Sequence, residues 1–330
     1  MNVRTHSHPP APHRPRGDTH RDRTPPVDAV VVGGGPAGLS AALVLGRARQ
    51  RVLVLDAGRP ANANTPAVGG LLAQSRMAPF DLRRAGRDQL AGHPTVEVRD
   101  GEVLDVSADG GGFAVRTDGG AVRARALVLA HGLRYDPPSL PGIEPLWGRS
   151  VFHCPFCDGW EVRDLSIGVH GNGPEAARSA LVVSGWSDDV VLLTDGSADV
   201  DFGEAEQLRR RGIVIRDDPV ARLEGEDGRL ARVVFADGST DDRTGLFFMP
   251  RFTPSPLPAQ LGCEVDESGA IVIDDDGRTS VAGVFAAGDA TTGKKAVVLA
   301  AAAGSRAAYA INAGLASGLL PGAGRSVASA

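Results

Sequence analysis

The sequence predicts an α/β fold with two Rossmann-like units, the second inserted into the first. Two glycine-rich turns support this prediction, GGGPAG at residues 33–38 and GNGPEA at residues 171–176, each between a short apolar run and an alanine-rich stretch. A third apolar run at residues 284–287 ends in Gly-Asp and precedes another alanine-rich segment. Strand, glycine turn and helix in this order are typical of units that bind dinucleotides. The third segment predicts that the first unit is completed after the second one ends.

The predicted organisation has four segments. Residues 1–27 contain six prolines, five arginines and four of the chain's eight histidines. This composition cannot bury enough apolar surface to offset the entropy of ordering, so we expect a disordered tail. Its lack of an apolar stretch argues against a secretory signal. Residues 28–145 and 251–330 form the predicted first unit, an FAD-binding domain in two parts, and residues 146–250 form the inserted unit.

Composition limits the partners of the protein. The net charge is −5, which gives no general attraction to nucleic acid or to anionic lipid. No run of the chain approaches the roughly 18 apolar residues that a membrane helix needs. We therefore expect neither nucleic acid nor a membrane as a partner. Three cysteines in 330 residues are too few for a secreted disulfide scaffold, so the cytoplasm is the expected location.

The first glycine turn has the full context of a dinucleotide fingerprint. A strand, the turn, a helix and a second strand follow one another over residues 30–56. Gly33 permits the tight turn, Gly35 lets a pyrophosphate approach the backbone, and Gly38 lets helix and strand pack closely. Asp56 ends the second strand, where its carboxylate is placed to accept a hydrogen bond from an adenosine ribose.

The second glycine turn repeats the pattern less completely over residues 166–195. Gly171 and Gly173 occupy the first two glycine positions, and Ala176 stands where the third glycine is expected. Asp195 follows the next strand, in the place of the ribose-binding acid. Two interpretations stay open, a nicotinamide nucleotide site and an eroded turn that binds no nucleotide.

The stretch HCPFCDGW at residues 153–160 contains the pair Cys154 and Cys157. Such a pair binds a metal, staples a loop or exchanges electrons. Zinc sites usually have four ligands, and the chain has no second pair of this spacing, so we predict no metal site. A bridge across so short a loop contributes little stability. The pair therefore predicts a thiol–disulfide couple, and a short helix beginning there would lower a thiol pKa.

Three motifs together resemble the thioredoxin-reductase family. They are GGGPAG near the start, CPFCDG at residues 154–159 before the second glycine turn, and GVFAAGDA at residues 283–290 before an alanine-rich helix. The resemblance extends in order over residues 28 to about 316. It implies an FAD-dependent disulfide oxidoreductase with two Rossmann-like domains that forms a homodimer.

The resemblance also assigns the flavin site. It implies that the ADP half of FAD is held by Gly33, Gly35, Pro36, Ala37, Gly38 and Asp56. Gly288 and Asp289 would bind the ribityl chain. The helix that begins near Ala296 would point its N-terminus at the flavin ring, where its dipole stabilises negative charge.

For the redox pair, the resemblance implies that one sulfur faces the flavin and the other faces the substrate. We expect Cys157 near the flavin and Cys154 outward. Asp158 is the expected acid–base group that moves a proton as thiol and flavin exchange electrons. The alternative for Asp158 is a carboxylate that satisfies free N–H groups in the first turn of a helix.

The sequence departs from the family at the nucleotide. Members that use NADPH carry a basic cluster after the second strand of the inserted domain. Residues 194–206 here read TDGSADVDFGEAE, with five acidic residues and no lysine or arginine. A phosphate dianion would meet like charges there, which makes NADPH use doubtful. Asp195 suits NADH better, if a nicotinamide nucleotide binds at all.

A branch of the family matches this departure. Its dithiol oxidases close disulfides in microbial natural products such as holomycin and gliotoxin, and their flavin passes electrons to O₂ instead of accepting them from NADPH. Trp160 and Glu161 resemble that branch, whereas Asp158 replaces its histidine and His131 replaces the usual threonine of the second flavin motif. We favour oxidation of a small dithiol by O₂. The alternatives are NAD(P)H-dependent reduction of a thioredoxin-like protein and a flavin-binding redox sensor without turnover.

Overall fold

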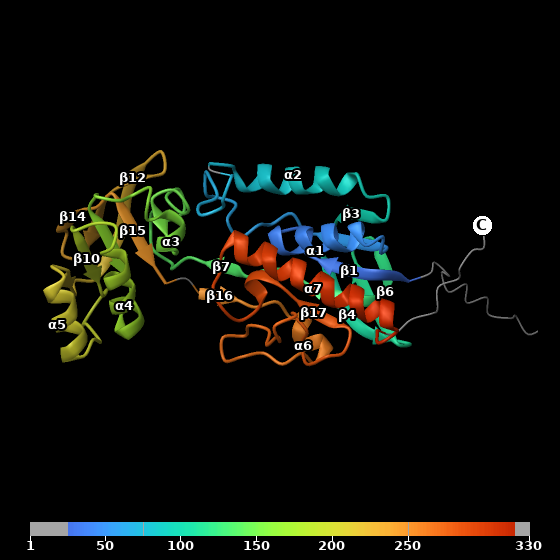
Figure 1. Ribbon diagram of the computed structural model, residues 1–330. Coiled ribbons are helices and arrows are strands. Elements are labelled where there is room, and N and C mark those ends of the chain that lie inside the picture. The colour runs from blue at the N-terminus through green and yellow to red at the C-terminus, as the bar shows by residue number, and fades with distance from the viewer. Residues whose placement is uncertain (1–25, 75, 250, 321–330) are drawn as a thin grey trace, which may run out of the picture.

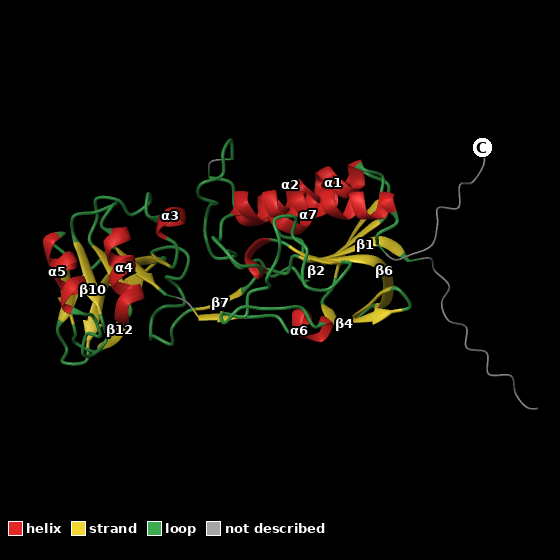
Figure 2. Ribbon diagram, turned by 60° about the horizontal axis from the view of Figure 1, so that its bottom comes forward, coloured by secondary structure: helices red, strands yellow, loops and turns green. Residues whose placement is uncertain are grey.

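The computed structural model describes residues 26–74, 76–249 and 251–320. Two lobes lie side by side and are joined by two crossing segments, which carry strands β7 (Arg134–Asp136) and β16 (Arg251–Thr253) (Figures 1 and 2). The two strands pair antiparallel. Most of the predicted tail lies outside the described residues, but Val27 already pairs with Ala124 and begins the first strand.

The first lobe is built on a seven-stranded sheet. Its parallel part has the order β3, β2, β1, β6, and β17 joins β6 in parallel near its C-terminal end. The hairpin of β4 and β5 continues the sheet antiparallel from the first half of β6. The strands are β1 (Val27–Val32), β2 (Val52–Asp56), β3 (Val96–Asp100), β4 (Val103–Asp109), β5 (Gly112–Thr117), β6 (Gly120–Leu129) and β17 (Val284–Ala286).

Helices cover both faces of this sheet, which explains why β1 and β2 are apolar apart from Asp28 and Asp56. Helices α1 (Pro36–Arg47), α2 (Pro79–Ala91) and α7 (Val297–Ser317) lie on one face, and the short α6 (Leu257–Leu261) lies on the other (Figures 1 and 2). Helices α1 and α7 approach closely because Gly304 has no side chain, and an added Cβ there would overlap the carbonyl oxygen of Ala37.

The second lobe contains a five-stranded parallel sheet of order β11, β10, β9, β15, β8 and a separate antiparallel sheet of three strands. Its elements are β8 (Val151–Phe152), α3 (Pro155–Asp158), β9 (Ile167–His170), α4 (Gly173–Val183), β10 (Val190–Leu193), α5 (Phe202–Arg210), β11 (Val214–Arg216), β12 (Val220–Glu226), β13 (Arg229–Phe235), β14 (Thr240–Asp242) and β15 (Gly245–Phe248). The order of the first four strands is that of a doubly wound nucleotide-binding unit.

The predicted fold class is therefore confirmed, since β17 and α7 return to the first lobe after the second lobe is complete. The domain boundaries after residues 145 and 250 remain predictions, and residue 250 lies outside the described part of the chain. Helix α7 begins at Val297, with Ala296 as its N-cap in agreement with the expected start, and extends to Ser317. Within the described residues, no helix has the length and apolar character needed to cross a membrane.

Candidate functional site

The first glycine turn presents an open helix N-terminus. An added Cβ on Gly38 would overlap the carbonyl oxygen of Gly33, so the turn packs against helix α1 only when residue 38 is glycine. In front of Gly35, in contrast, an added Cβ would meet nothing within 4 Å. Gly35 is the N-cap of α1 and provides no side-chain hydrogen bond, and Pro36 and Ala37 follow it in the first turn. The N–H groups at this helix start are available to an anionic ligand.

Asp56 lies at the end of β2, beside this turn, and is buried. Its Oδ2 accepts hydrogen bonds from Arg83 at 2.5 Å and Arg87 at 2.6 Å, and its Oδ1 accepts one from the backbone N–H of Gly58 at 3.0 Å. Burial raises the pKa of Asp56, but the Gly58 and arginine hydrogen bonds outweigh it and leave the pKa below its usual value. Sequence reasoning missed both arginines, although their spacing of four residues places them on one face of α2.

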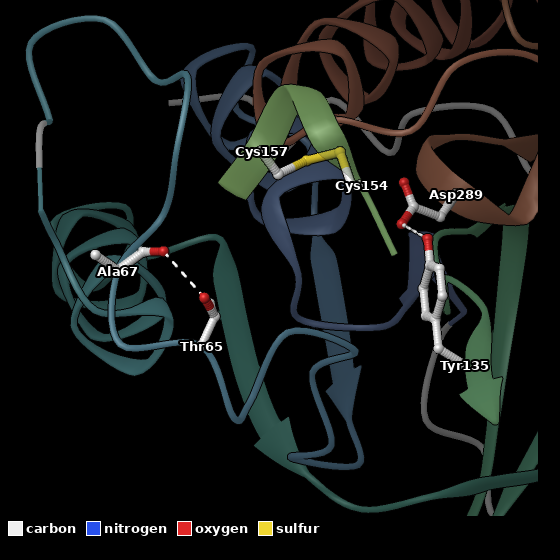
Figure 3. The surroundings of a disulfide bond; sticks show 6 residues. All are labelled: Thr65, Ala67, Tyr135, Cys154, Cys157 and Asp289. Carbon is white, nitrogen blue, oxygen red and sulfur yellow. Dashed lines mark hydrogen bonds between the residues drawn. A yellow bond between two sulfur atoms is a disulfide. The ribbon is translucent and has the colours of Figure 1, made fainter. Parts of the chain in front are cut away.

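Asp289 follows β17, in the short 3₁₀ helix Gly288–Ala290. Its Oδ2 accepts a hydrogen bond from the hydroxyl of Tyr135 at 2.9 Å (Figure 3). Burial raises the pKa of Asp289, and the Tyr135 hydrogen bond and the positive charge of Lys295 offset part of this rise. An added Cβ on Gly288 would lie 2.9 Å from the Cβ of Ala37, so β17 brings Gly288 against the first glycine turn. Sequence reasoning missed Tyr135, which no local motif marks.

Cys154 and Cys157 form a disulfide across helix α3, with Cys154 at the N-cap. His153 precedes the pair, and the centroid of its ring lies 4.5 Å from the ring centroid of Tyr135. The carbonyl oxygen of Cys157 lies against Gly69 of the first lobe. Figure 3 shows the disulfide between the loop that carries Gly69 and the Tyr135–Asp289 pair. The structure therefore brings the redox pair of the second lobe to the candidate flavin residues of the first.

No cluster of three or more His, Cys, Asp or Glu side chains is arranged to hold a metal in the described part of the chain. Cys263, the remaining cysteine, is a buried free thiol. It lies in the core on the α6 side of the first sheet, away from the disulfide.

Asp158 is the last residue of α3 and directly follows Cys157. Burial raises the pKa of its carboxyl to about 7, and the negative charge of Glu161 adds to the rise. A carboxyl with this pKa holds or releases a proton near neutral pH, as a general acid or base requires. His153, which precedes the pair, has its pKa lowered to about 4 by burial and stays neutral.

The second glycine turn is closed by its own chain. The side-chain Oδ1 of Asn172 accepts hydrogen bonds from the N–H groups of Gly173 at 2.9 Å and Asp199 at 2.7 Å. Its Nδ2 donates to the carbonyl of Ser197 at 2.9 Å. Asn172 is therefore the side-chain cap of helix α4 and ties the acidic loop over the turn. Ala176 is buried behind it.

Asp195, the predicted ribose-binding acid, is also engaged within the chain. It adopts a left-handed conformation with φ of 52°, and its Oδ1 accepts a hydrogen bond from the N–H of Val220 at 2.7 Å. Its Oδ2 lies 3.8 Å from Nε2 of His170. The second unit thus has a capped helix start, and one oxygen of the Asp195 carboxylate accepts a hydrogen bond from the chain itself.

The first unit fits the FAD that the resemblance implies. Besides the open turn at Gly35, the first unit has a buried Nε2 on His131 that has no hydrogen-bond partner in the described structure, and His170 beside the second turn has a buried Nε2 in the same state. An added Cβ on Gly33 would lie 3.0 Å from the Cα of His131, so the backbone of His131 lies beside the first turn. A buried unpaired polar atom costs free energy, and a bound dinucleotide offers it a partner.

Comparisons with known proteins identify the family of the chain. A family model described as pyridine nucleotide-disulphide oxidoreductase matches residues 27–307. Thioredoxin reductase tcpT of Claviceps purpurea is 32% identical over 281 residues, which cover 80% of this chain and 86% of the relative. The crystal structure of HlmI is similar with a TM-score of 0.85 at 41% identity. The match covers 88% of this chain and 93% of that chain. That of the oxidoreductase from Agrobacterium tumefaciens has a TM-score of 0.83 at 34% identity, covering 88% of this chain and 99% of that chain.

The match to the family model spans both lobes, and the relative and the two solved structures cover most of the chain. The chain therefore belongs to the pyridine nucleotide-disulphide oxidoreductase family and is an FAD-dependent oxidoreductase of the thioredoxin-reductase type.

Proposed function

We propose that this protein oxidises a small dithiol to a disulfide, with Cys154 and Cys157 as the redox pair and O₂ as the final electron acceptor. The observation that carries this choice is the contrast between the two glycine turns. The turn before α1 is open, while Asn172 caps α4 and holds the acidic loop over the other turn. An enzyme that accepts electrons from NADPH needs the second turn to be available.

The exchange with substrate uses the disulfide alone. A substrate thiolate attacks the sulfur of Cys154 and expels the thiolate of Cys157, which forms a mixed disulfide. The second substrate thiol then attacks the substrate sulfur of that bond and releases Cys154. The substrate leaves as a disulfide, oxidised by two electrons, and Cys154 and Cys157 are left as the reduced pair.

The reduced pair must then lose two electrons and its protons. FAD supplies this chemistry when bound, since it takes the electron pair from the dithiol and gives it to O₂, which leaves as hydrogen peroxide. Asp158 accepts the thiol proton, and its pKa of about 7 lets it release that proton to water afterwards. Cys157, on the side of Gly69, is our choice for the sulfur that faces the flavin.

We assign FAD binding to Gly33, Gly35, Pro36, Ala37, Gly38, Asp56, Gly288, Asp289 and the helix start at Ala296. The assignment rests on the resemblance and on the open turn described above. A cytoplasmic homodimer is likewise proposed on the resemblance alone.

A second candidate is reduction of a thioredoxin-like protein by a pyridine nucleotide. The name of the family and that of the relative from Claviceps purpurea favour it. The closed turn at Asn172 and the acidic loop oppose it, since the 2′-phosphate of NADPH would find no basic partner there.

The purified yellow protein under argon separates the two candidates. NADPH, NADH and a small dithiol are added in turn while the absorbance of the oxidised flavin is followed. We expect bleaching by the dithiol only, and recovery of the colour with release of hydrogen peroxide when air is admitted. Rapid bleaching by low concentrations of NADPH or NADH would make the protein a reductase instead.

A further inference from the structure

The loop between β2 and α2, residues 57–78, contacts the second lobe at two points. At Gly69, an added Cβ would lie far inside contact distance of the carbonyl oxygen of Cys157. At Gly148 of the second lobe, an added Cβ would lie 3.0 Å from the Cβ of Asn64. Each lobe thus contributes one glycine to the contact, and Figure 3 shows this loop beside the disulfide helix.

Internal hydrogen bonds hold the shape of the loop. The N–H of Val68 donates to the carbonyl of Met77 at 2.8 Å, and the N–H of Thr65 donates to the carbonyl of Asn62 at 3.2 Å. Val68 is buried, although the residues around it are half-buried or exposed. The loop around Gly69 is therefore held by its own hydrogen bonds and by the burial of Val68.

The backbone does not require glycine at position 69. Gly69 is absent from the left-handed region that only glycine adopts readily, whereas its neighbour Gly70 has φ of 67°. Gly70 shows the opposite combination, because an added Cβ there meets nothing within 4 Å. What excludes a side chain at residue 69 is therefore Cys157 and not the conformation of the loop.

We propose that Gly69 is a positioning residue, whose missing side chain sets how closely Cys157 settles onto the first lobe and hence where the disulfide stands beside the residues around Asp289. The proposal rests on the proposed function for its catalytic consequence. Real Cβ atoms essentially never lie under 3.0 Å from another heavy atom. An alanine at residue 69 must therefore separate the loop from Cys157 by roughly 1 Å, and we expect the resulting misplacement of the disulfide to cost on the order of 100-fold in rate.

The test compares Gly69→Ala with Gly70→Asn in the FAD-loaded protein. Asparagine tolerates the left-handed conformation, so the control changes the same loop without touching Cys157. We expect Gly69→Ala to slow flavin bleaching by a small dithiol on the order of 100-fold. In the first turnover, the Cys154–Cys157 disulfide produces one equivalent of substrate disulfide. We expect the amount and the rate of this first equivalent to equal those of the wild type. Gly70→Asn behaves as the wild type in both measurements.

A second readout needs no turnover. Hydrogen exchange of the FAD-free protein reports whether the amides of residues 154–159 remain held against the loop. We expect exchange about tenfold faster in Gly69→Ala and unchanged in Gly70→Asn. Gly148→Asn probes the other contact, where the added Cβ overlaps its neighbour less than at Gly69, so we expect a smaller acceleration in the same segment.

The two readouts keep the proposals apart. If a dithiol fails to bleach the wild-type flavin, the proposed function is wrong, while faster exchange in Gly69→Ala still supports the positioning contact. If Gly69→Ala bleaches at the wild-type rate and its exchange over residues 154–159 is unchanged, Gly69 does not position the disulfide. Both substitutions lie at solvent-exposed residues, so neither removes a core contact.

Discussion

Asp158 combines two properties that a proton carrier beside a disulfide needs. It directly follows Cys157, and burial together with the charge of Glu161 raises the pKa of its carboxyl to about 7. In the unfolded chain the same carboxyl titrates near 3.8. Between these two values the folded protein holds a proton that the unfolded chain has released, so the free energy of unfolding falls as the pH rises through this interval.

The variant Asp158→Asn removes this cost and also removes the proton carrier. We expect its stability advantage over the wild type to widen by roughly 1–3 kcal/mol between about pH 5 and pH 8. We expect its flavin reduction by dithiol to be slower by about 10²–10⁴-fold. Denaturant unfolding at the two pH values and anaerobic stopped-flow absorbance measure the two effects. A stability difference that does not change with pH would show that the Asp158 carboxyl is already ionised in the folded protein.

At the scale of elements, the protein contains two strand–turn–helix units that differ at the helix start. Helix α1 begins at Gly35 with no side-chain cap, and helix α4 begins behind Asn172, whose side chain accepts from the N–H of Gly173. An uncapped start attracts an anion through its free N–H groups and its dipole, and a capped start has already satisfied part of this demand. The same sequence motif therefore begins one helix without a side-chain cap and the other with one.

The variant Gly35→Ala tests the open start. Its added Cβ meets no protein atom within 4 Å, so we expect the melting temperature of the FAD-free protein to stay unchanged. The same methyl group occupies the approach of the pyrophosphate, and we expect FAD affinity to fall by about 10–100-fold, or about 1.4 kcal/mol for each factor of ten. Equilibrium titration with FAD measures the affinity.

Gly38→Ala is the matched comparison, because its Cβ overlaps the carbonyl oxygen of Gly33 and must destabilise the FAD-free fold as well. Unchanged FAD affinity in Gly35→Ala would mean that the pyrophosphate does not approach this turn.

At the scale of the whole molecule, local patterns predicted the fold and marked the residues that we propose for the site. The glycine turns, the CxxC pair and the third motif are each contained in a few neighbouring residues, and their order along the chain predicts that the second unit is inserted into the first. The partners that complete the site were not predictable in this way. Arg83 reaches Asp56 from a different helix, and Tyr135 reaches Asp289 across 154 residues. Such contacts depend on how remote segments pack, which no periodicity or spacing in the chain records.

The two lobes meet at the disulfide, and the central claim is that electrons cross this contact from a dithiol to O₂. The most direct measurement is the stoichiometry in air without any pyridine nucleotide. The account predicts one O₂ consumed and one hydrogen peroxide released for each substrate disulfide, since each step moves two electrons. Cys154→Ser is expected to abolish the exchange while FAD stays bound. Oxygen uptake that requires NADPH, or that persists in Cys154→Ser, would contradict the account.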